Sequence, residues 1–191
     1  MKKNIVISRI KGFCSFLLLC TFAFSLQSCK EDIDDSNFAI AKDKTVTDYL
    51  VASDSLSDIK AIFDRVKLGR SDNASSLSAV LSARGNYTVF APTNSAVKKY
   101  VSSLTGSTDV SSLTYEQAQL IAFNCVIDNG TEGAYETPDF PTSGTFTLSN
   151  LNDRLLSCHQ DSTQNNSPYV INGTSTVIKE NQKVSNGIVH L

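Results

Sequence analysis

Apolar residues between Thr45 and Gly85 recur every three or four positions, which is the spacing of one helix face. The pattern predicts a short helix over residues 45–52, a second from a cap at Ser53 or Asp54, and a third that ends at Gly85. Gly69 stands where a glycine would end the second helix. The expected inward residues are Val46, Tyr49 and Leu50, then Leu56, Ile59, Ile62, Phe63 and Val66, then Leu77, Val80 and Leu81.

Residues 86–100 predict a strand that turns directly into a helix. Thr88, Val89 and Phe90 suit a buried strand, and Pro92 ends it because proline cannot donate to a strand ladder. Thr93 is a suitable N-cap for the helix that follows. The expected apolar face of this helix is Ala96, Val97, Tyr100, Val101 and Leu104.

After a further helix the pattern changes to short alternating segments. Thr114 would cap that helix, whose inner residues would be Tyr115, Ala118, Ile121 or Ala122, and Cys125. Residues 128–143 contain two Pro and two Gly and predict a long surface connection. Short strands are expected at 145–148, 151–159, 169–172, 176–179 and 188–191. The sequence therefore predicts an α+β domain, with N-terminal helices packed on a small β-sheet or β-wedge.

Two motifs resemble the signatures of the fasciclin domain, a non-catalytic adhesion and binding module. They are Thr88, Val89, Phe90, Ala91, Pro92, Thr93 and Asn94 in the first, and Asn186, Gly187 and His190 in the second. The resemblance implies a fasciclin-like domain over residues 45–191. It also implies that the final strand is cut short and the domain incomplete at its C-terminus, because the family normally continues through further residues.

The first 28 residues have the pattern of a secretory signal peptide. Four basic residues precede an apolar run over 12–26, which is shorter than the ~20 residues of a membrane span. Leu26-Gln-Ser-Cys29 resembles the lipobox of bacterial lipoproteins, in which the cysteine is lipidated. Cys29 is thus the predicted lipid attachment site, and an ordinary signal with an incidental cysteine is the alternative.

Residues 29–44 form an expected acidic tether. The run from Lys30 to Asp35 is either a solvated spacer or, as it also resembles, the export signal of lipoproteins on the exterior face of the outer membrane. Removal of 28 residues takes four of the 17 Lys and Arg and none of the 19 Asp and Glu, so the formal charge becomes −6. Nucleic acid is therefore excluded as a partner, because such a surface repels phosphates.

After residue 28 the chain contains few of the cysteine and histidine residues that commonly form catalytic and metal sites. Cys125 and Cys158 could pair in a disulfide or be two small buried hydrophobes. His159 and His190 lack companions at metal-ligand spacing, and no nucleophile or phosphate-binding motif occurs. We therefore expect neither a metal nor another cofactor, and no enzymatic activity.

Three further features concern surface recognition. Many fasciclin domains carry a Tyr-His pair implicated in integrin binding where this sequence has Asn124-Cys125. Asp54-Ser55-Leu56 and Asp161-Ser162-Thr163 resemble a short bacterial O-glycosylation motif, which makes Ser55 and Ser162 candidate sites. Loops at 105–113, 128–143 and 160–168 are the expected contact regions.

The resulting hypothesis is a lipid-anchored module on the outer membrane, facing the cell exterior. Its partners would be the membrane, through the anchor, and an extracellular protein or glycan. The alternative is a structural accessory subunit of an outer-membrane or polysaccharide-uptake complex, with another envelope protein as its partner.

Overall fold

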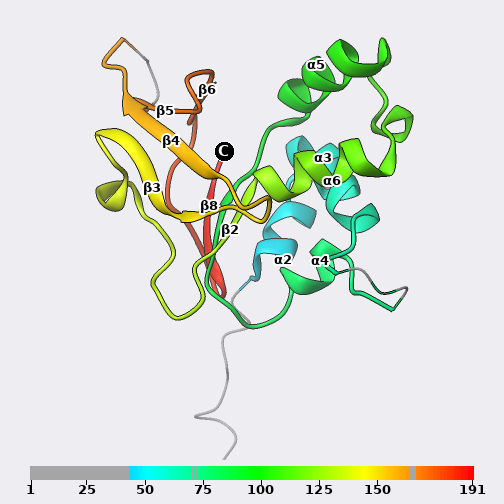
Figure 1. Ribbon diagram of the computed structural model, residues 1–191, viewed down its shortest axis with the longest axis horizontal. Helices are drawn as coiled ribbons and strands as arrows, with labels where there is room; N and C mark the ends of the chain where they lie inside the picture. The colour runs from blue at the N-terminus through cyan, green and yellow to red at the C-terminus, as the bar shows by residue number, and fades with distance from the viewer. Residues whose placement is uncertain (1–43, 70, 72, 164–166) are drawn as a thin grey trace, which may run out of the picture. The chain divides into compact units, whose positions relative to one another are not determined.

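Figure 1 shows a computed structural model in which a group of helices packs beside two β-sheets. The structure describes residues 44–69, 71, 73–163 and 167–191. These residues belong to one compact unit, Lys42–Leu191. The expected signal peptide, Cys29 and nearly all of the tether lie outside the described residues.

The helices begin where the sequence places capping side chains. Thr45 and Thr114 each form a capping box with the residue three positions on, and Thr93 accepts from the Ala96 N–H. Gly106 ends the longest helix in the left-handed conformation, at φ +76°. The helices are α2 (Val46–Val51), α3 (Ser57–Arg65), α4 (Leu77–Val80), α5 (Asn94–Thr105) and α6 (Tyr115–Asn124), with 3-10 turns at Asp54–Leu56, Val110–Ser112 and Thr137–Asp139.

The predicted inward face of α3 is confirmed, but the predicted end of this helix is wrong. Each of the five expected residues from Leu56 to Val66 is buried. However, α3 ends at Arg65, because Val66 is already extended and Lys67 pairs with Ser76 in an isolated bridge. Gly69 therefore lies in the turn beyond the helix, with φ +118°.

Only two of the five residues predicted for the apolar face of α5 are buried. Val97 and Val101 are buried, whereas Ala96, Tyr100 and Leu104 are exposed. Ala96 and Tyr100 each come one position before a buried valine, and the exposed residues lie on a side of α5 that the described part of the chain leaves open to solvent. Spacing alone identified the apolar residues but could not show which of them have a partner.

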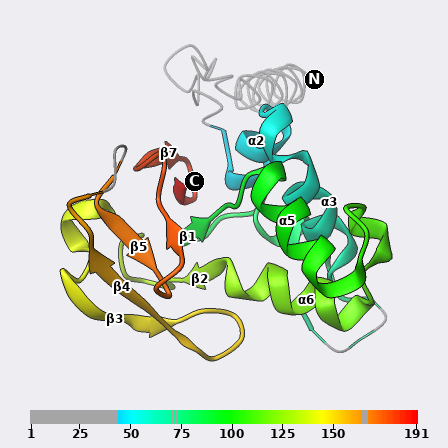
Figure 2. The ribbon, with the colours of Figure 1, turned by 90° about the horizontal axis from the view of Figure 1, so that it is seen from above.

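The first sheet has the strand order β2-β1-β8-β7, and its central pair is parallel. Its strands are β1 (Tyr87–Phe90), β2 (Val126–Asp128), β7 (Gln182–Val184) and β8 (Gly187–His190). The sequence analysis missed β2 and β7, which have three residues each and are too short to show a period. In Figure 2, β1 and β2 lie between the helices and the second sheet.

The second sheet is antiparallel, with the order β3-β4-β5-β6. Its strands are β3 (Ser143–Ser149), β4 (Leu155–Gln160), β5 (Tyr169–Ile171) and β6 (Ser175–Thr176). The predicted strand at 151–159 begins four residues too early, because residues 150–154 form a turn in which Asp153 has φ +57°. The predicted α+β fold class is confirmed, and the β part consists of two four-stranded sheets.

Two clusters of buried side chains hold these layers together. The first lies between the helices and one face of the β1–β8 sheet, and it contains Phe63, Leu77 and Val89. The second lies between the two sheets and is rich in aromatic rings, including Phe140 and Phe146. Phe140 in this cluster and the buried Thr137 anchor the 128–143 connection, most of whose other residues lie at the surface as predicted.

No helix in the described part of the chain is long and apolar enough to cross a membrane.

Candidate functional site: a signature core and an open groove

The two sequence motifs lie side by side, on the paired strands β1 and β8. Tyr87 is opposite Gly187 and Phe90 is opposite His190. At Gly187 (φ +155°) a Cβ atom would lie 2.0 Å from the Tyr87 carbonyl oxygen, so a side chain there would force the two strands apart. The close parallel pairing thus requires glycine at this position.

His190 is fully buried and uses both ring nitrogens. Its Nδ1 accepts from the Asn181 N–H at 3.3 Å, and Nε2 lies 3.0 Å from the Tyr135 carbonyl oxygen, to which it can only donate. Burial lowers the pKa of His190, while the bond to Tyr135 and the nearby carboxylates of Glu180 and Glu136 oppose this effect. The ring is therefore a neutral, packed structural group.

Thr88 attaches the first motif to the 128–143 connection. Its buried hydroxyl donates to Asn129 Oδ1 at 2.9 Å and accepts from the Tyr135 N–H at 2.8 Å. Asn129 Nδ2 in turn donates to the Gly133 carbonyl at 3.0 Å. These bonds satisfy polar groups that are enclosed beside the sheet.

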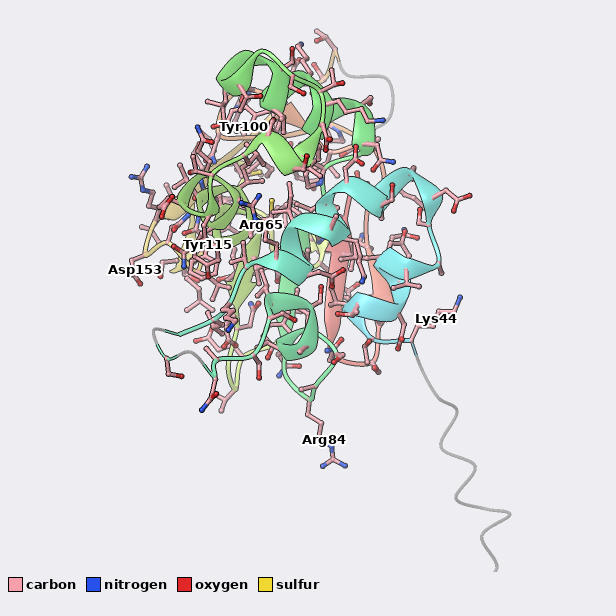
Figure 3. All side chains as sticks on the ribbon, turned by 90° about the vertical axis from the view of Figure 1, so that its right-hand side faces the viewer. Lys44, Arg65, Arg84, Tyr100, Tyr115 and Asp153 are labelled. Carbon is pink, nitrogen blue, oxygen red and sulfur yellow. The ribbon has the colours of Figure 1, made fainter. Side chains whose placement is uncertain are left out.

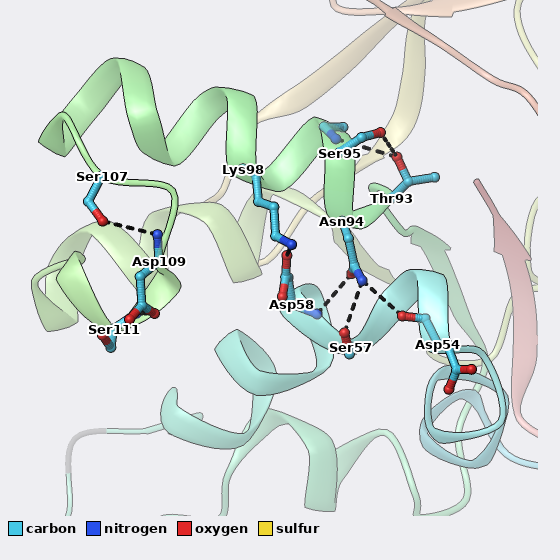
Figure 4. Close-up of polar contacts among 11 residues, drawn as sticks. Asp54, Ser57, Asp58, Thr93, Asn94, Ser95, Lys98, Ser107, Asp109 and Ser111 are labelled. Atoms are coloured by element: carbon cyan, nitrogen blue, oxygen red, sulfur yellow. Dashed lines mark hydrogen bonds and ion pairs between the residues drawn. The ribbon is translucent and has the colours of Figure 1, made fainter.

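Asn94 joins the start of α5 to the start of α3, as Figure 4 shows. Its Nδ2 donates to the Asp54 carbonyl at 2.8 Å and lies 2.9 Å from Ser57 Oγ, and its Oδ1 accepts from the Asp58 N–H at 3.0 Å. Lys98 Nζ lies 3.8 Å from Asp58 Oδ2 in the same region. Asn94 therefore fixes one helix against the other.

Asn186 has the same kind of role at the start of α2. Its Oδ1 accepts from the Val46 N–H at 2.9 Å, and its Nδ2 donates to the carbonyls of Leu81 and Ala83 at 2.8 and 2.7 Å. Of the remaining motif residues, Val89 and Ala91 are buried in the first cluster, and Pro92 ends β1. Each motif residue thus contributes to folding, and together they form what we call the signature core.

An open groove of about 710 Å³ lies outside this core, and we call it the α5–β6 groove. It is bounded by α5 and α6 on one side and by the segment from the β5–β6 turn to Ile178 on the other. Figure 1 shows the end of β8 between α5 and β6. Apolar lining residues include Pro92, Ala96, Tyr100, Leu120, Val177 and Ile178.

The groove carries exposed apolar side chains and little charge. Tyr100, Leu120 and Ile178 are 49, 42 and 47% exposed. Tyr100 is labelled on the outer side of α5 in Figure 3. Lys99 is the sole charged side chain among the described lining residues, and hydroxyl groups such as those of Ser103 and Ser175 supply much of the polar surface. Such an open and largely apolar surface suits the binding of a partner.

Asn124 and Cys125, at the position of the Tyr-His pair of other fasciclin domains, both line the groove. The Asn124 side chain is hydrogen-bonded within the protein. Its Oδ1 accepts from Asn150 Nδ2 at 3.1 Å and from Asn152 Nδ2 at 3.0 Å. These bonds tie the end of α6 to the β3–β4 turn. This position is therefore structural in the present chain.

The possible disulfide between Cys125 and Cys158 is not formed, and both thiols are free. Cys125 packs against the first cluster of buried residues, whereas Cys158 belongs to the second. Burial raises the pKa of the Cys125 thiol to about 12 and that of Cys158 to about 11. Cys158 is buried and Cys125 is partly buried, so the alternative interpretation as small buried hydrophobes fits Cys158 better than Cys125.

The remaining candidate residues are exposed or outside the described part of the chain. Ser55 and Ser162 are both exposed, the first in a 3-10 turn and the second in the turn after β4, and their modification stays a prediction. His159 lies on the exposed side of β4. Within residues 44–69, 71, 73–163 and 167–191, no group of His, Cys, Asp and Glu could hold a metal ion.

Residues 67–191 match the family model of the fasciclin domain. The chain belongs to the fasciclin domain family. Fasciclin domains are associated with cell adhesion and are generally non-catalytic. Helices α2 and α3 precede the matched region but pack in the same core, where Val46 bonds to Asn186.

Among solved structures, the chain is similar to a pair of FAS1 domains from the insect cell adhesion molecule fasciclin I. The TM-score is 0.56 at 18% identity, with 78% of this chain and 49% of that chain covered. The present chain therefore spans about half the length of that protein, and the likeness shows a shared fold. A comparison with curated proteins finds no match.

Proposed function

We propose that the protein is a lipid-anchored cell-surface module that binds an extracellular protein through the α5–β6 groove, without catalysis. The observation that carries the proposal is the gathering of Tyr100, Leu120 and Ile178 on one open groove. Centres of protein interfaces are enriched in aromatic and apolar side chains and depleted of charge. The adhesion role of the insect relative named above supports binding as the activity.

A protein fits this groove better than a glycan does. Tyr100 supplies the one largely exposed aromatic ring among the described lining residues, and Lys99 supplies the one charge. A small polar ligand needs several convergent polar groups to fix its orientation. Apolar walls on both sides suit instead the side chains of a polypeptide.

The groove also supports a second candidate function, that of a structural accessory subunit in an outer-membrane or polysaccharide-uptake complex. The same apolar residues would then be covered by another envelope protein. Matched variants identify the groove as the contact in either case. Leu120→Ser alters a leucine in the groove that is 42% exposed, and Leu155→Ser alters one outside it that is 52% exposed.

The binding test uses photocrosslinking in intact cells, with the crosslinker placed at Ser103 in the groove. We expect a discrete adduct that Leu120→Ser diminishes and Leu155→Ser leaves unchanged. Equal adducts for both variants would contradict the groove as the contact. Identification of the adduct by mass spectrometry separates an extracellular partner from an envelope partner.

The anchor is tested at Cys29. Radioactive palmitate should label the wild-type protein and the Cys14→Ala variant, because Cys14 lies within the segment that is removed. Cys29→Ala should abolish labelling and leave the precursor unprocessed. Continued labelling of Cys29→Ala would refute the lipid attachment site.

The exterior location is tested by protease treatment of intact cells. Loss of the folded domain, with a periplasmic control protein intact, is the expected outcome. Protection of both proteins would place the domain in the periplasm and favour the accessory-subunit function.

A further inference from the structure

The ring of His190 packs against two phenylalanine rings at the end of the central parallel pair. Phe90 stacks on it with centroids 5.4 Å apart and planes at 25°, and Phe140 packs on it at 4.9 Å. The residue has no exposed surface. Any change in the charge of this ring therefore takes place away from water.

The hydrogen bonds of His190 require a neutral ring. Nδ1 receives the Asn181 N–H, so it must present a lone pair, and the ring proton must be on Nε2 facing Tyr135. A second proton on Nδ1 would point at the Asn181 N–H, which is itself a donor. The charged ring therefore cannot keep the Asn181 bond, and it would also carry a buried charge.

The two partners of the ring hold the middle of the 128–143 connection. Tyr135 belongs to that connection. The Asn181 side chain reaches it as well, because its Oδ1 accepts from the Thr137 N–H at 2.9 Å and its Nδ2 donates to Thr137 Oγ1 at 2.7 Å. Asn181 is held at φ +53°, in the left-handed region that asparagine tolerates better than most residues other than glycine. Losing the bond to His190 removes one of the contacts that maintain this conformation.

The charged groups near the ring lie on the connection and on the segment from Lys179 through β7. Glu180 and Glu136 both favour a proton on the ring, and Lys183 Nζ, 2.8 Å from Glu136 Oε1, offsets one of them. Asp139 and Lys179 lie on the same two segments. The paired strands add no charge near the ring, because β8 has no other titratable residue and β1 has Tyr87 at its far end.

We propose that His190 is an acid-sensitive latch for the 128–143 connection. When the ring takes up a second proton, the bond from the Asn181 N–H breaks while the bond to the Tyr135 carbonyl remains, so Asn181 and the Thr137 N–H that it holds detach from the end of β8. The β1–β8 pair stays intact because backbone hydrogen bonds hold it independently of the ring. The latch thus couples mild acidification to the opening of one segment beside the aromatic cluster.

Amide hydrogen exchange of the whole protein between pH 7.5 and 5 tests this latch. We expect the protection factors of Asn181 and Thr137 to fall by up to tenfold per pH unit below about 6.5, while those of Val89 and Ile188 stay constant. Parallel loss at all four amides would indicate global unfolding and would overturn the proposal. Constant protection at Asn181 and Thr137 would overturn it as well.

A pair of charge variants assigns the effect to His190 without altering the ring. Glu180→Gln removes a carboxylate that favours the charged ring, so the midpoint of the exchange change should shift to lower pH. Glu132→Gln makes the same change at an exposed position of the connection and should leave the midpoint in place. Equal midpoints in the two variants would show that another group controls the opening.

Discussion

The signature core and the α5–β6 groove differ in how far their side chains are buried and bonded to other segments. In the core, Asn94, Asn186 and His190 each bond to two or more partners from other segments. In the groove, Tyr100 and Ile178 remain about half exposed. The residues that make the family recognisable thus specify the fold, and the residues available for recognition lie elsewhere. Substitutions should therefore lower stability in the core and alter binding in the groove.

Gly187→Ala should give the largest loss of stability. The added Cβ would meet the Tyr87 backbone, which cannot move without breaking the β1–β8 ladder. We expect the free energy of unfolding to fall by about 3 to 5 kcal/mol in urea denaturation. Gly133→Ala is the matched control, because nothing lies within 4 Å of its added Cβ. A loss as small as that of the control would mean that β1 and β8 separate easily.

Asn186→Ala should have the next largest effect. It leaves the Val46 N–H and the carbonyls of Leu81 and Ala83 without their side-chain partner. The expected cost is about 2 to 4 kcal/mol, measured in the same way. Asn73→Ala, at an exposed position, should stay within about 0.5 kcal/mol of wild type. If the two variants were equally stable, water would be replacing the lost bonds.

Acid should destabilise the core more moderately. Burial lowers the pKa of His190 in the folded protein, so the unfolded chain binds the proton more readily. The contribution of the neutral ring is complete above about pH 6.5 and declines as the pH falls through the folded pKa, by at most about 1.4 kcal/mol per pH unit. Urea denaturation at pH 7.5, 6.5 and 5.5 measures this slope. Stability that is flat or rises over this range would contradict it.

The sequence predicted the core better than it predicted the groove, and the reason is physical. Caps at Thr45, Thr93 and Thr114, and the five buried residues of the second helix, follow from local rules that a single segment obeys. The parallel pairing of Phe90 with His190 joins residues 100 positions apart, and only the family resemblance indicated that both motifs belong to one domain.

The groove could not be predicted, because it depends on which side chains of α5 remain exposed once the chain has folded. Tyr100 and Leu104 have the spacing of core residues, and nothing in their neighbourhood in the sequence shows that no element covers them. Similarly, the role of Asn124 follows from its bonds to Asn150 and Asn152, and residue 152 was predicted to lie in a strand rather than a turn. Errors thus concentrate where a residue's role is decided by contacts with distant segments.

Leu120→Ser should have the smallest effect on stability and the clearest effect on binding. Because Leu120 is 42% exposed in the folded protein, its replacement removes only part of the apolar area that a core leucine buries, and the free energy of unfolding should fall by about 1 kcal/mol. Leu155→Ser, at 52% exposure outside the groove, should change it by a similar amount. The two variants should separate only in photocrosslinking, where Leu120→Ser loses the adduct. A large loss of stability in Leu120→Ser alone would assign that leucine to the core. The side of the groove that α6 forms would then be part of the folding core and not a surface available for binding.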